Sequence, residues 1–393
     1  MTPLTLDDLS ELEGLLSAEE RAIQGSVRRF VRERFMPHAA ECFERERFPR
    51  ELVSELAELG LLGASLSGHG CAGLSAVQYG LALQELEYGD SGLRSFVSVQ
   101  GSLAMYAIHA FGSDEQRARF LPGLARGELI GCFGLTEPDS GSDPGSMRTQ
   151  ARRDGSDFLL TGTKMWITNA PIADVAVVWA KVDGGGAGSI RGFLVERGMA
   201  GFETPRIEGK LSLRASETGQ LVLDGCRVPE SHLLPLSQGL KSPFACLDQA
   251  RRGVAWGATG AAKACFESAC GYARERRQFG VPIAQKQLIQ AELADMASEI
   301  VKADLLNLHF SRLEDARPGG IRPEQVSLCK RNNVAMALDV ARRCRAILGA
   351  NGILLEYPVM RHALNLESVY TYEGTHEIHT LVLGRALTGE AAF

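Results

Sequence analysis

The sequence predicts an α+β protein built from an N-terminal α-helical domain, a middle β-barrel or β-sandwich domain and a C-terminal four-helix bundle. Helical periodicity dominates the first third of the chain. Short runs of β-branched residues separated by Gly, Asp and Asn turns follow it, and long helical segments fill the rest. These changes in pattern place the expected domains at residues 1–130, 131–240 and 241–393.

Leucines at helical spacing indicate helices in the first domain. One apolar stripe is formed by Leu52, Leu56 and Leu59. A further helix is expected over residues 77–87. A short helix is expected over residues 114–121, because Ser113 supplies an N-cap and Pro122 with Gly123 ends it.

The middle domain shows strand-like runs. They cover residues 158–160, 165–168, 175–182, 192–195 and 220–223. Turn residues separate them, including three consecutive glycines at 184–186, and this spacing is typical of a small barrel or sandwich.

The last domain returns to long periodic segments. Residues 244–274, 286–313 and 323–348 are too long for strands, and the loop at 317–320 separates the last two. Long antiparallel helices joined by short loops predict a four-helix bundle.

Composition excludes several classes of protein. The 393 residues carry 42 Lys and Arg against 48 Asp and Glu, a net charge of −6, and no basic block. We therefore expect neither a nucleic-acid nor a membrane partner. The nine cysteines are scattered and no metal-binding spacing occurs, so free thiols and no metal site are expected.

The N-terminal stretch is acidic and lacks the basic segment of a signal or transit peptide. No run approaches the 18 or more apolar residues of a membrane span. We expect a cytoplasmic, bacterial protein, or a mitochondrial matrix protein only if a transit peptide has been removed.

Taken singly, the candidate functional motifs allow ordinary interpretations. Residues 131–147 are rich in Gly, Ser, Thr and Asp, and form either a plain turn-rich loop or a backbone-lined cleft for a flat polar ligand. Trp166 at a strand end is either core or a ligand contact. The arginines of 274–280 form either a solvated face or a diphosphate site. Residues 348–352 form a helix cap, and Glu373 alone suggests an exposed turn carboxylate.

Taken together and in this order, the motifs resemble the acyl-CoA dehydrogenase family from about residue 15 to the C-terminus. They read GLTEPDSGSD, KMWITNA, RRQFGVPI, LGANGI and YEGTHEIHTLVLGRALTG. Within the family the chain most resembles the glutaryl-CoA dehydrogenases. Three segments carry that likeness: residues 91–95 with 98–100, the GKLSLRAS stretch at 209–216 and the NLESVYTYEGTHEIH loop at 365–379.

The resemblance implies FAD as a non-covalent cofactor and a homotetramer in which FAD contacts cross a subunit interface. The implied flavin and adenosine contacts are Phe133, Leu135, Thr136, Trp166, Ile167, Thr168, Arg276, Gln278, Phe279, Gln287, Ala346, Ile347, Leu348, Gly349, Ala350, Thr375 and Glu377. An electron-transferring flavoprotein is the implied electron acceptor.

The resemblance also implies an acyl-CoA substrate oxidised between its α and β carbons, with Glu373 as the base for the α proton. The implied substrate contacts are Glu87, Arg94, Ser95, Ser98, Ser142, Phe244, Leu247, Asp248, Arg251, Tyr372 and Gly374. Burial of a carboxylate raises its pKa towards the working pH, which suits a base. His376 and His379 lie three apart on the last helix, a spacing that lacks the further ligands of a metal site.

Arg94 indicates the substrate. A dicarboxylic acyl chain brings a second charge into the pocket, and a buried carboxylate needs a cation and hydroxyl groups. The likeness assigns that role to Arg94, with glutaryl-CoA as substrate. The ordinary alternative is an arginine paired with Glu87 or Asp90 at a helix end.

Glu87 and Tyr372 match polar residues of decarboxylating members, so crotonyl-CoA and CO2 are the expected products. Two alternatives stay open. One is oxidation of another carboxylated acyl-CoA, or of glutaryl-CoA without decarboxylation. The other is a non-catalytic scaffold subunit.

Overall fold

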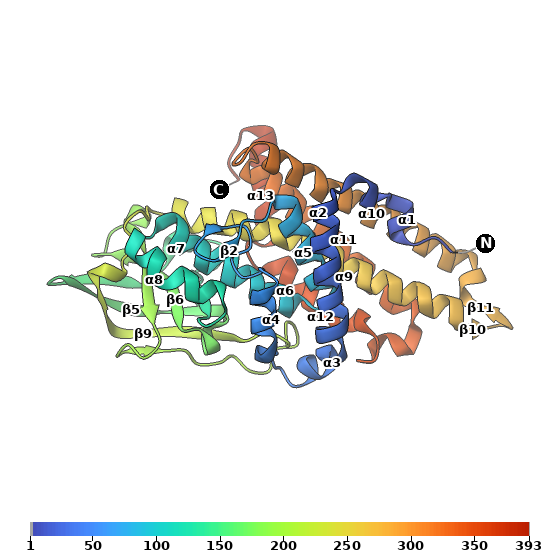
Figure 1. Ribbon diagram of the computed structural model, residues 1–393, viewed down its shortest axis with the longest axis horizontal. Coiled ribbons are helices and arrows are strands. Elements are labelled where there is room, and N and C mark those ends of the chain that lie inside the picture. Colours follow the sequence, from blue (N-terminus) through green and yellow to red (C-terminus); the bar gives the residue numbers. More distant parts are fainter. Residues whose placement is uncertain (1–2, 393) are drawn as a thin grey trace.

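The computed structural model describes residues 3–392 of the chain. The outer ends of the first and third expected domains, residues 1–2 and 393, lie outside the described residues. The expected α+β class is confirmed: a helical N-terminal part and a helical C-terminal part enclose a curled, mostly antiparallel sheet. In Figure 1 strands β5, β6 and β9 lie at one end of the molecule, and the long helices α9 and α10 extend to the other.

The N-terminal part is mainly helical and contains one short hairpin, β1 (Ser67–Gly68) with β2 (Cys71–Ala72). Its helices are α1 (Leu6–Ser10), α2 (Ala18–Phe30), α3 (Met36–Glu44), α4 (Val53–Glu58), α5 (Ala76–Gly89), α6 (Ser91–Ser98), α7 (Tyr106–Phe111) and α8 (Asp114–Ala125). A π-helical segment, Val99–Met105, joins α6 to α7. Helix α5 is buried on nearly every face, so it forms the centre of this part of the fold.

One helix end was predicted wrongly. Ser113 caps α8 as expected, accepting from the backbone N–H of Gln116, but the helix continues through Pro122 to Ala125. A proline inside a helix costs about 3 kcal/mol. Leu121 and Leu124 are fully buried on the same helix, and their burial offsets that cost.

The middle part is a seven-stranded sheet in the order β3-β6-β4-β5-β9-β8, with β7 paired to β6. Its strands are β3 (Gly131–Gly134), β4 (Gln150–Asp154), β5 (Asp157–Thr168), β6 (Val175–Val182), β7 (Ile190–Glu196), β8 (Phe202–Glu203) and β9 (Thr218–Pro229). The predicted strands at 158–160 and 165–168 are one strand, β5, interrupted by shifts in its register with β9. The prediction that 131–147 is one loop was wrong at its start, because β3 is a buried strand parallel to β6.

The C-terminal part contains the expected bundle. Its helices are α9 (Lys241–Glu275), α10 (Gln287–Ala316), α11 (Pro323–Ile347) and α12 (Pro358–Thr371), followed by α13 (His376–Thr388). A hairpin of β10 (Arg277–Gln278) and β11 (Val281–Pro282) follows α9. Alanines and small residues fill the shared core, which lets the helices approach closely.

Residues 3–392 contain neither a membrane-spanning helix nor a group of metal-binding side chains. Within them, no helix is both long and apolar enough to span a membrane. Nor does this part of the chain gather three or more His, Cys, Asp or Glu side chains in a group that could hold a metal ion.

Candidate active site

Arg94 on α6 is completely buried, and two side chains hold its guanidinium. Its Nε donates to Glu87 Oε2 at 2.6 Å, and its Nη2 donates to the hydroxyl of Tyr372. Burial opposes the positive charge, but Glu87 and Tyr372 together raise the pKa of Arg94. Pairing with Glu87 was the ordinary alternative, and it is present here. The other possible partner, Asp90, pairs with Arg361 instead.

A glycine on α9 makes room for this ion pair. A Cβ at Gly257 would lie 1.9 Å from Glu87 Oε2 and 3.1 Å from Arg94 Nε. Both distances are below van der Waals contact, so α9 can approach the pair only with glycine at this position. The packing of α5, α6 and α9 therefore fixes where Arg94 points.

Two hydroxyls on α6 lie next to Arg94. Ser95 is the next residue and Ser98 lies one helical turn further on, and both are buried. Within the described residues neither Oγ atom has a hydrogen-bond partner. A buried polar atom without a partner costs free energy unless a ligand satisfies it. These hydroxyls are thus free to bind an acceptor brought by a substrate.

Glu373 lies in the loop between α12 and α13, as expected, but it is not an exposed turn carboxylate. Its backbone adopts a left-handed conformation with φ of 53°. Its Oε2 is enclosed and has no hydrogen-bond partner among residues 3–392. Burial raises the pKa of Glu373, although the charges of Arg94, Lys330 and Arg251 act in the opposite direction. A carboxylate in this setting can accept a proton from a bound ligand.

Arg251 on α9 anchors the Glu373 loop. Its Nε donates to the carbonyl oxygen of Glu373 at 2.6 Å, and its Nη1 pairs with Asp248 at 2.9 Å. Gly374 is required beside it, because its φ is 101° and a Cβ there would lie 2.8 Å from His379 Nε2. The structure therefore brings Glu373 and three predicted substrate contacts, Asp248, Arg251 and Gly374, to one place.

The remaining predicted substrate contacts lie further out. Leu247 is partly buried against the core between the sheet and the N-terminal helices. Phe244, at the start of α9, is 39% exposed, and Ser142 lies in an exposed loop after β3. These positions are accessible to a ligand that enters from the surface at the N-terminal end of α9.

A buried ion pair between Lys164 and Glu137 holds the polar loop that follows β3. Lys164 Nζ lies 2.8 Å from Glu137 Oε1 and also donates to the carbonyl of Leu135 at 3.1 Å. Burial lowers the pKa of Lys164 to about 8, and the charge of Glu137 partly opposes this. Glu137 in turn accepts from the backbone N–H of Thr149 at 2.9 Å. This pair fixes the loop against β5.

Trp166 is the most exposed aromatic residue of this loop region. It has a φ of 64° at an irregularity of β5 and is 57% exposed, so the core interpretation was wrong. The neighbouring Met165 N–H donates to the carbonyl of Thr136 at 2.9 Å, which joins the two predicted flavin motifs. Phe133 and Leu135 are buried beneath them, Ile167 is buried in the sheet core, and Thr168 is partly exposed.

The predicted diphosphate and adenosine contacts form a separate group. A cavity of about 300 Å³ at the end of α11 is lined by Arg276, Gln278, Ile347, Leu348, Gly349 and Ala350, with Tyr272, Ile283 and Asn351. Gly349 has a φ of 59°, as a helix C-cap requires. Ala346, Phe279 and Gln287 lie on the exposed surface around this cavity rather than in its lining.

The last two predicted cofactor residues, Thr375 and Glu377, begin α13. Thr375 caps the helix by accepting from the backbone N–H of Ile378, and Glu377 is exposed in the first turn. Hydrogen bonding to its own backbone N–H and to Thr375 lowers the pKa of Glu377.

A further cavity of about 490 Å³ lies between α5, α9, α10 and α11, and none of the predicted site residues lines it. Tyr79 forms part of its wall, and its hydroxyl contacts Ser102 Oγ at 2.7 Å. Burial raises the pKa of Tyr79 to about 12. No motif in the sequence indicated this cavity.

Sequence reasoning also missed Lys330 on α11. Its side chain is 1% exposed, and its Nζ donates to the carbonyls of Tyr372 and Gly374. The signal was present, because Lys330 lies in register with the apolar Val326, Val334 and Ala337 on the buried side of α11.

Comparison with known proteins assigns the family. The chain matches the N-terminal domain of acyl-CoA dehydrogenases over residues 17–128, the middle domain over 132–226 and the C-terminal domain over 237–388. The chain belongs to the acyl-CoA dehydrogenase family. Members are oxidoreductases, so the scaffold alternative is set aside.

Individual relatives agree. A crystal structure of glutaryl-CoA dehydrogenase from Mycobacterium smegmatis is 58% identical, covers 100% of both chains and superposes with a TM-score of 0.97. A second glutaryl-CoA dehydrogenase structure from that organism, in complex with FADH2, is 53% identical over 100% of both chains, also with a TM-score of 0.97. The short-chain specific acyl-CoA dehydrogenase of Sus scrofa mitochondria is 36% identical over 92% of this chain and 88% of its own.

Proposed function

We propose that this acyl-CoA dehydrogenase oxidises glutaryl-CoA between its α and β carbons and then decarboxylates the product to crotonyl-CoA and CO2. The observation that carries the proposal is the buried guanidinium of Arg94 beside two unpartnered hydroxyls, hydrogen-bonded to Tyr372, the residue that precedes Glu373. The two mycobacterial glutaryl-CoA dehydrogenases that superpose on the whole chain support it.

FAD is the cofactor, and the residues present fit it. Trp166 offers an exposed flat ring at the edge of the polar loop. Arg276 and Gln278 provide a guanidinium and an amide in the cavity at the end of α11, a donor set suited to a diphosphate. When bound, the flavin supplies the two-electron acceptor for the β hydride. In the proposed holoenzyme, Trp166 with Thr136 and Thr168 would hold the ring.

Glu373 is the proposed base. The α proton of a thioester is weakly acidic, so the base must be dry, close and held in one orientation. The enclosed Oε2 of Glu373 meets the first requirement, and the anchored carbonyls around it meet the last. Because burial raises its pKa, the carboxylate binds the α proton more strongly than an exposed glutamate would.

Arg94 with Ser95 and Ser98 is the proposed site for the distal carboxylate of the substrate. A monocarboxylic acyl chain would leave the guanidinium and both hydroxyls without an additional acceptor. A glutaryl chain supplies two carboxylate oxygens that accept from all three. A monocarboxylic substrate therefore leaves buried polar groups of the site without hydrogen-bond partners. That cost favours glutaryl-CoA over monocarboxylic thioesters.

Loss of CO2 follows from the chemistry of the oxidised product. After oxidation the distal carboxylate is attached to the γ carbon of an α,β-unsaturated thioester. Breaking the bond between that carbon and the carboxylate releases CO2, and its electron pair enters a dienolate. Protonation of the γ carbon gives crotonyl-CoA, and Glu373, which took the α proton, is the proposed donor. Glu87 and Tyr372 both accept hydrogen bonds from Arg94. They are therefore placed to compete with the leaving carboxylate for the guanidinium and to weaken its binding.

A homotetramer and an electron-transferring flavoprotein as electron acceptor complete the proposal. Phe279, in the turn of the hairpin that follows α9, is 92% exposed, and Leu288, at the start of α10, is 82% exposed. Apolar side chains exposed to this degree are usual in protein interfaces. Their position next to Arg276 and Gln278 supports FAD contacts shared between subunits.

Product analysis tests the proposal. The purified holoenzyme is incubated with glutaryl-CoA and an artificial electron acceptor, and thioesters and CO2 are measured together. The proposal expects crotonyl-CoA and CO2 in equal amounts. Accumulation of the unsaturated dicarboxylic thioester without CO2 would support a non-decarboxylating dehydrogenase, and turnover of only monocarboxylic thioesters would refute the substrate.

A further inference from the structure

Lys330 on α11 is a buried cation in direct contact with the Glu373 loop. Its Nζ donates to the carbonyl oxygen of Tyr372 at 2.8 Å and to that of Gly374 at 2.6 Å. These are the two carbonyls on either side of Glu373. The ammonium group thus bridges the residues before and after the proposed base.

This contact stabilises an unusual backbone conformation. Glu373 has a φ of 53°, which a side chain with a Cβ adopts at a cost of about 1–3 kcal/mol. Arg251 holds the carbonyl of Glu373 itself at 2.6 Å. Three successive carbonyls of the loop are therefore bound by two cations from α9 and α11, and the loop has little freedom to relax.

The charge of Lys330 also acts on the carboxylate. Burial lowers the pKa of Lys330, and the nearby Glu373 opposes that shift. Conversely, burial raises the pKa of Glu373, and Lys330 lowers it. Each group therefore favours the charged form of the other.

Other ionisable groups face the pair from every neighbouring element. They are Arg94 on α6, Tyr79 and Glu87 on α5, Arg251 on α9, Tyr372 in the loop, and His376, Glu377 and His379 on α13. Burial keeps His379 neutral by lowering its pKa to about 3, and burial raises the pKa of Tyr372. Arg94 is neutralised by Glu87 at 2.6 Å, and Arg251 by Asp248 at 2.9 Å. Within residues 3–392 Lys330 forms no such close ion pair, and the charges of Glu373 and Glu377 act on it from a greater distance.

We propose that Lys330 is a positioning residue for the reaction, which fixes the Glu373 loop through two carbonyls and sets a positive charge beside the Glu373 carboxylate. The inference rests on the proposed role of Glu373 as base. It adds a second function to α11, whose buried face otherwise packs the bundle core.

Three substitutions separate the charge from the hydrogen bonds. Lys330→Gln keeps an N–H donor but removes the charge, Lys330→Arg keeps the charge, and Lys330→Met removes both. Lys302→Gln is the matched control, because Lys302 lies on α10, is 65% exposed and pairs only with Glu299 in the described structure.

The pH dependence of kcat/KM is the first measurement. Without the charge the pKa of Glu373 rises, so the acid limb of Lys330→Gln should move up by about one pH unit or more. Lys330→Arg and Lys302→Gln should keep the wild-type acid limb. A wild-type acid limb in both Lys330→Gln and Lys330→Met would overturn the proposal.

Infrared difference spectra are the second measurement and do not need turnover. Subtracting the spectrum of Glu373→Gln from that of the parent holoenzyme isolates the Glu373 carboxyl, which can be titrated in each Lys330 background. The carboxyl should protonate at higher pH when residue 330 is neutral, and an unchanged titration would contradict the proposal.

The two hypotheses can fail separately. Glutaryl-CoA and butyryl-CoA serve as substrates for the pH profiles. If the wild type oxidises neither, the proposed function fails, while the infrared titration still tests Lys330. If Lys330→Gln does not fold, the comparison of Lys330→Arg with Lys330→Met decides the same question.

Discussion

Two buried lysines, Lys263 on α9 and Lys330 on α11, show how the same side chain supports structure in one region and chemistry in another. Lys263 Nζ lies 2.8 Å from Asp304 Oδ2 and 3.8 Å from Asp7 Oδ1. Lys330 contacts two backbone carbonyls and shares its surroundings with Arg251 and other cations.

Their pKa values shift in opposite directions. Burial opposes the charge of both lysines, but Asp304 and Asp7 outweigh it and raise the pKa of Lys263. For Lys330 burial prevails and its pKa is lowered. A lysine with matched carboxylates remains a fixed charge, whereas a lysine among cations next to a buried glutamate is sensitive to that glutamate. The second arrangement is typical of catalytic sites.

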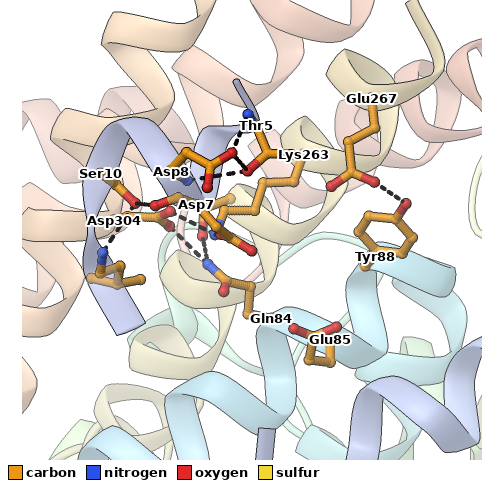
Figure 2. Close-up of polar contacts among 12 residues, drawn as sticks. Thr5, Asp7, Asp8, Ser10, Gln84, Glu85, Tyr88, Lys263, Glu267 and Asp304 are labelled. Atoms are coloured by element: carbon orange, nitrogen blue, oxygen red, sulfur yellow. Dashed lines mark hydrogen bonds and ion pairs between the residues drawn. The ribbon is translucent and has the colours of Figure 1, made fainter. Parts of the chain in front are cut away.

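The region around Lys263 is a polar network between helices rather than a pocket. Figure 2 shows Lys263, Asp304 and Gln84 together, with Asp7 of α1 beside them. Gln84 Nε2 donates to Asp304 Oδ1 at 2.7 Å and to Thr259 Oγ1 at 2.6 Å. The network joins α1, α5, α9 and α10, so its loss should affect stability and leave the chemistry intact.

The largest expected effect comes from the catalytic region. Replacing Glu373 with Gln removes the proposed base without changing its size, and turnover should fall by roughly 10³-fold or more. Bound FAD, measured by its absorbance, should remain. Turnover within tenfold of wild type would mean that another group takes the α proton.

The next effect concerns stability. Asp304→Asn leaves the Lys263 charge buried without its main partner, and the free energy of unfolding should fall by about 3 kcal/mol. Equilibrium unfolding in urea measures the change, and kcat under stable conditions should equal that of wild type. A large loss of kcat in a folded Asp304→Asn protein would break the distinction between the two regions.

A smaller effect is expected at the edge of the same network. Asp7 is 41% exposed and lies 3.8 Å from Lys263, so solvent screens the pair. Asp7→Asn should lower the free energy of unfolding by about 0.5 kcal/mol or less. A loss as large as that of Asp304→Asn would show that Asp7 is an equal partner of Lys263.

The smallest effect concerns pH: the contribution of Lys263 to the free energy of unfolding should not depend on pH near neutrality. Because the folded pKa of Lys263 is raised above its ordinary 10.5, its contribution to stability is complete below that pH and is lost only above it. The difference in unfolding free energy between wild type and Lys263→Met should therefore be constant from about pH 6 to 9. A difference that varies across this range would mean that Lys263 titrates in the folded protein.

Much of the fold followed from local pattern. The long helices of the bundle and strand β6 (Val175–Val182) were expected close to their observed bounds, because periodicity over many residues is a strong signal. Strand β3 was missed because Gly131–Gly134 has two glycines among its four residues and is stabilised by its parallel pairing with β6. Pro122 was misjudged because burial decided the helix end, and burial is not visible locally.

The candidate site was also only partly predictable from local sequence. Motifs identified Arg94, Glu373 and the flavin loop, since each lies in a distinctive short sequence. Lys330 and the pair of Asp90 with Arg361 were missed because their partners lie 42 or more residues away in the chain. Such contacts depend on how α11 and α12 pack, and no local pattern encodes them.

We propose above all that Arg94 binds the distal carboxylate of the substrate. The direct measurement is the ratio of kcat/KM for glutaryl-CoA to that for butyryl-CoA, in wild type and in Arg94→Met. Both substrates meet the same folded protein, so any general damage cancels in the ratio. The substitution should lower the ratio by about 100-fold or more, the cost of leaving a buried carboxylate without its cation. An unchanged ratio would place Arg94 in the structure alone and contradict the proposed substrate.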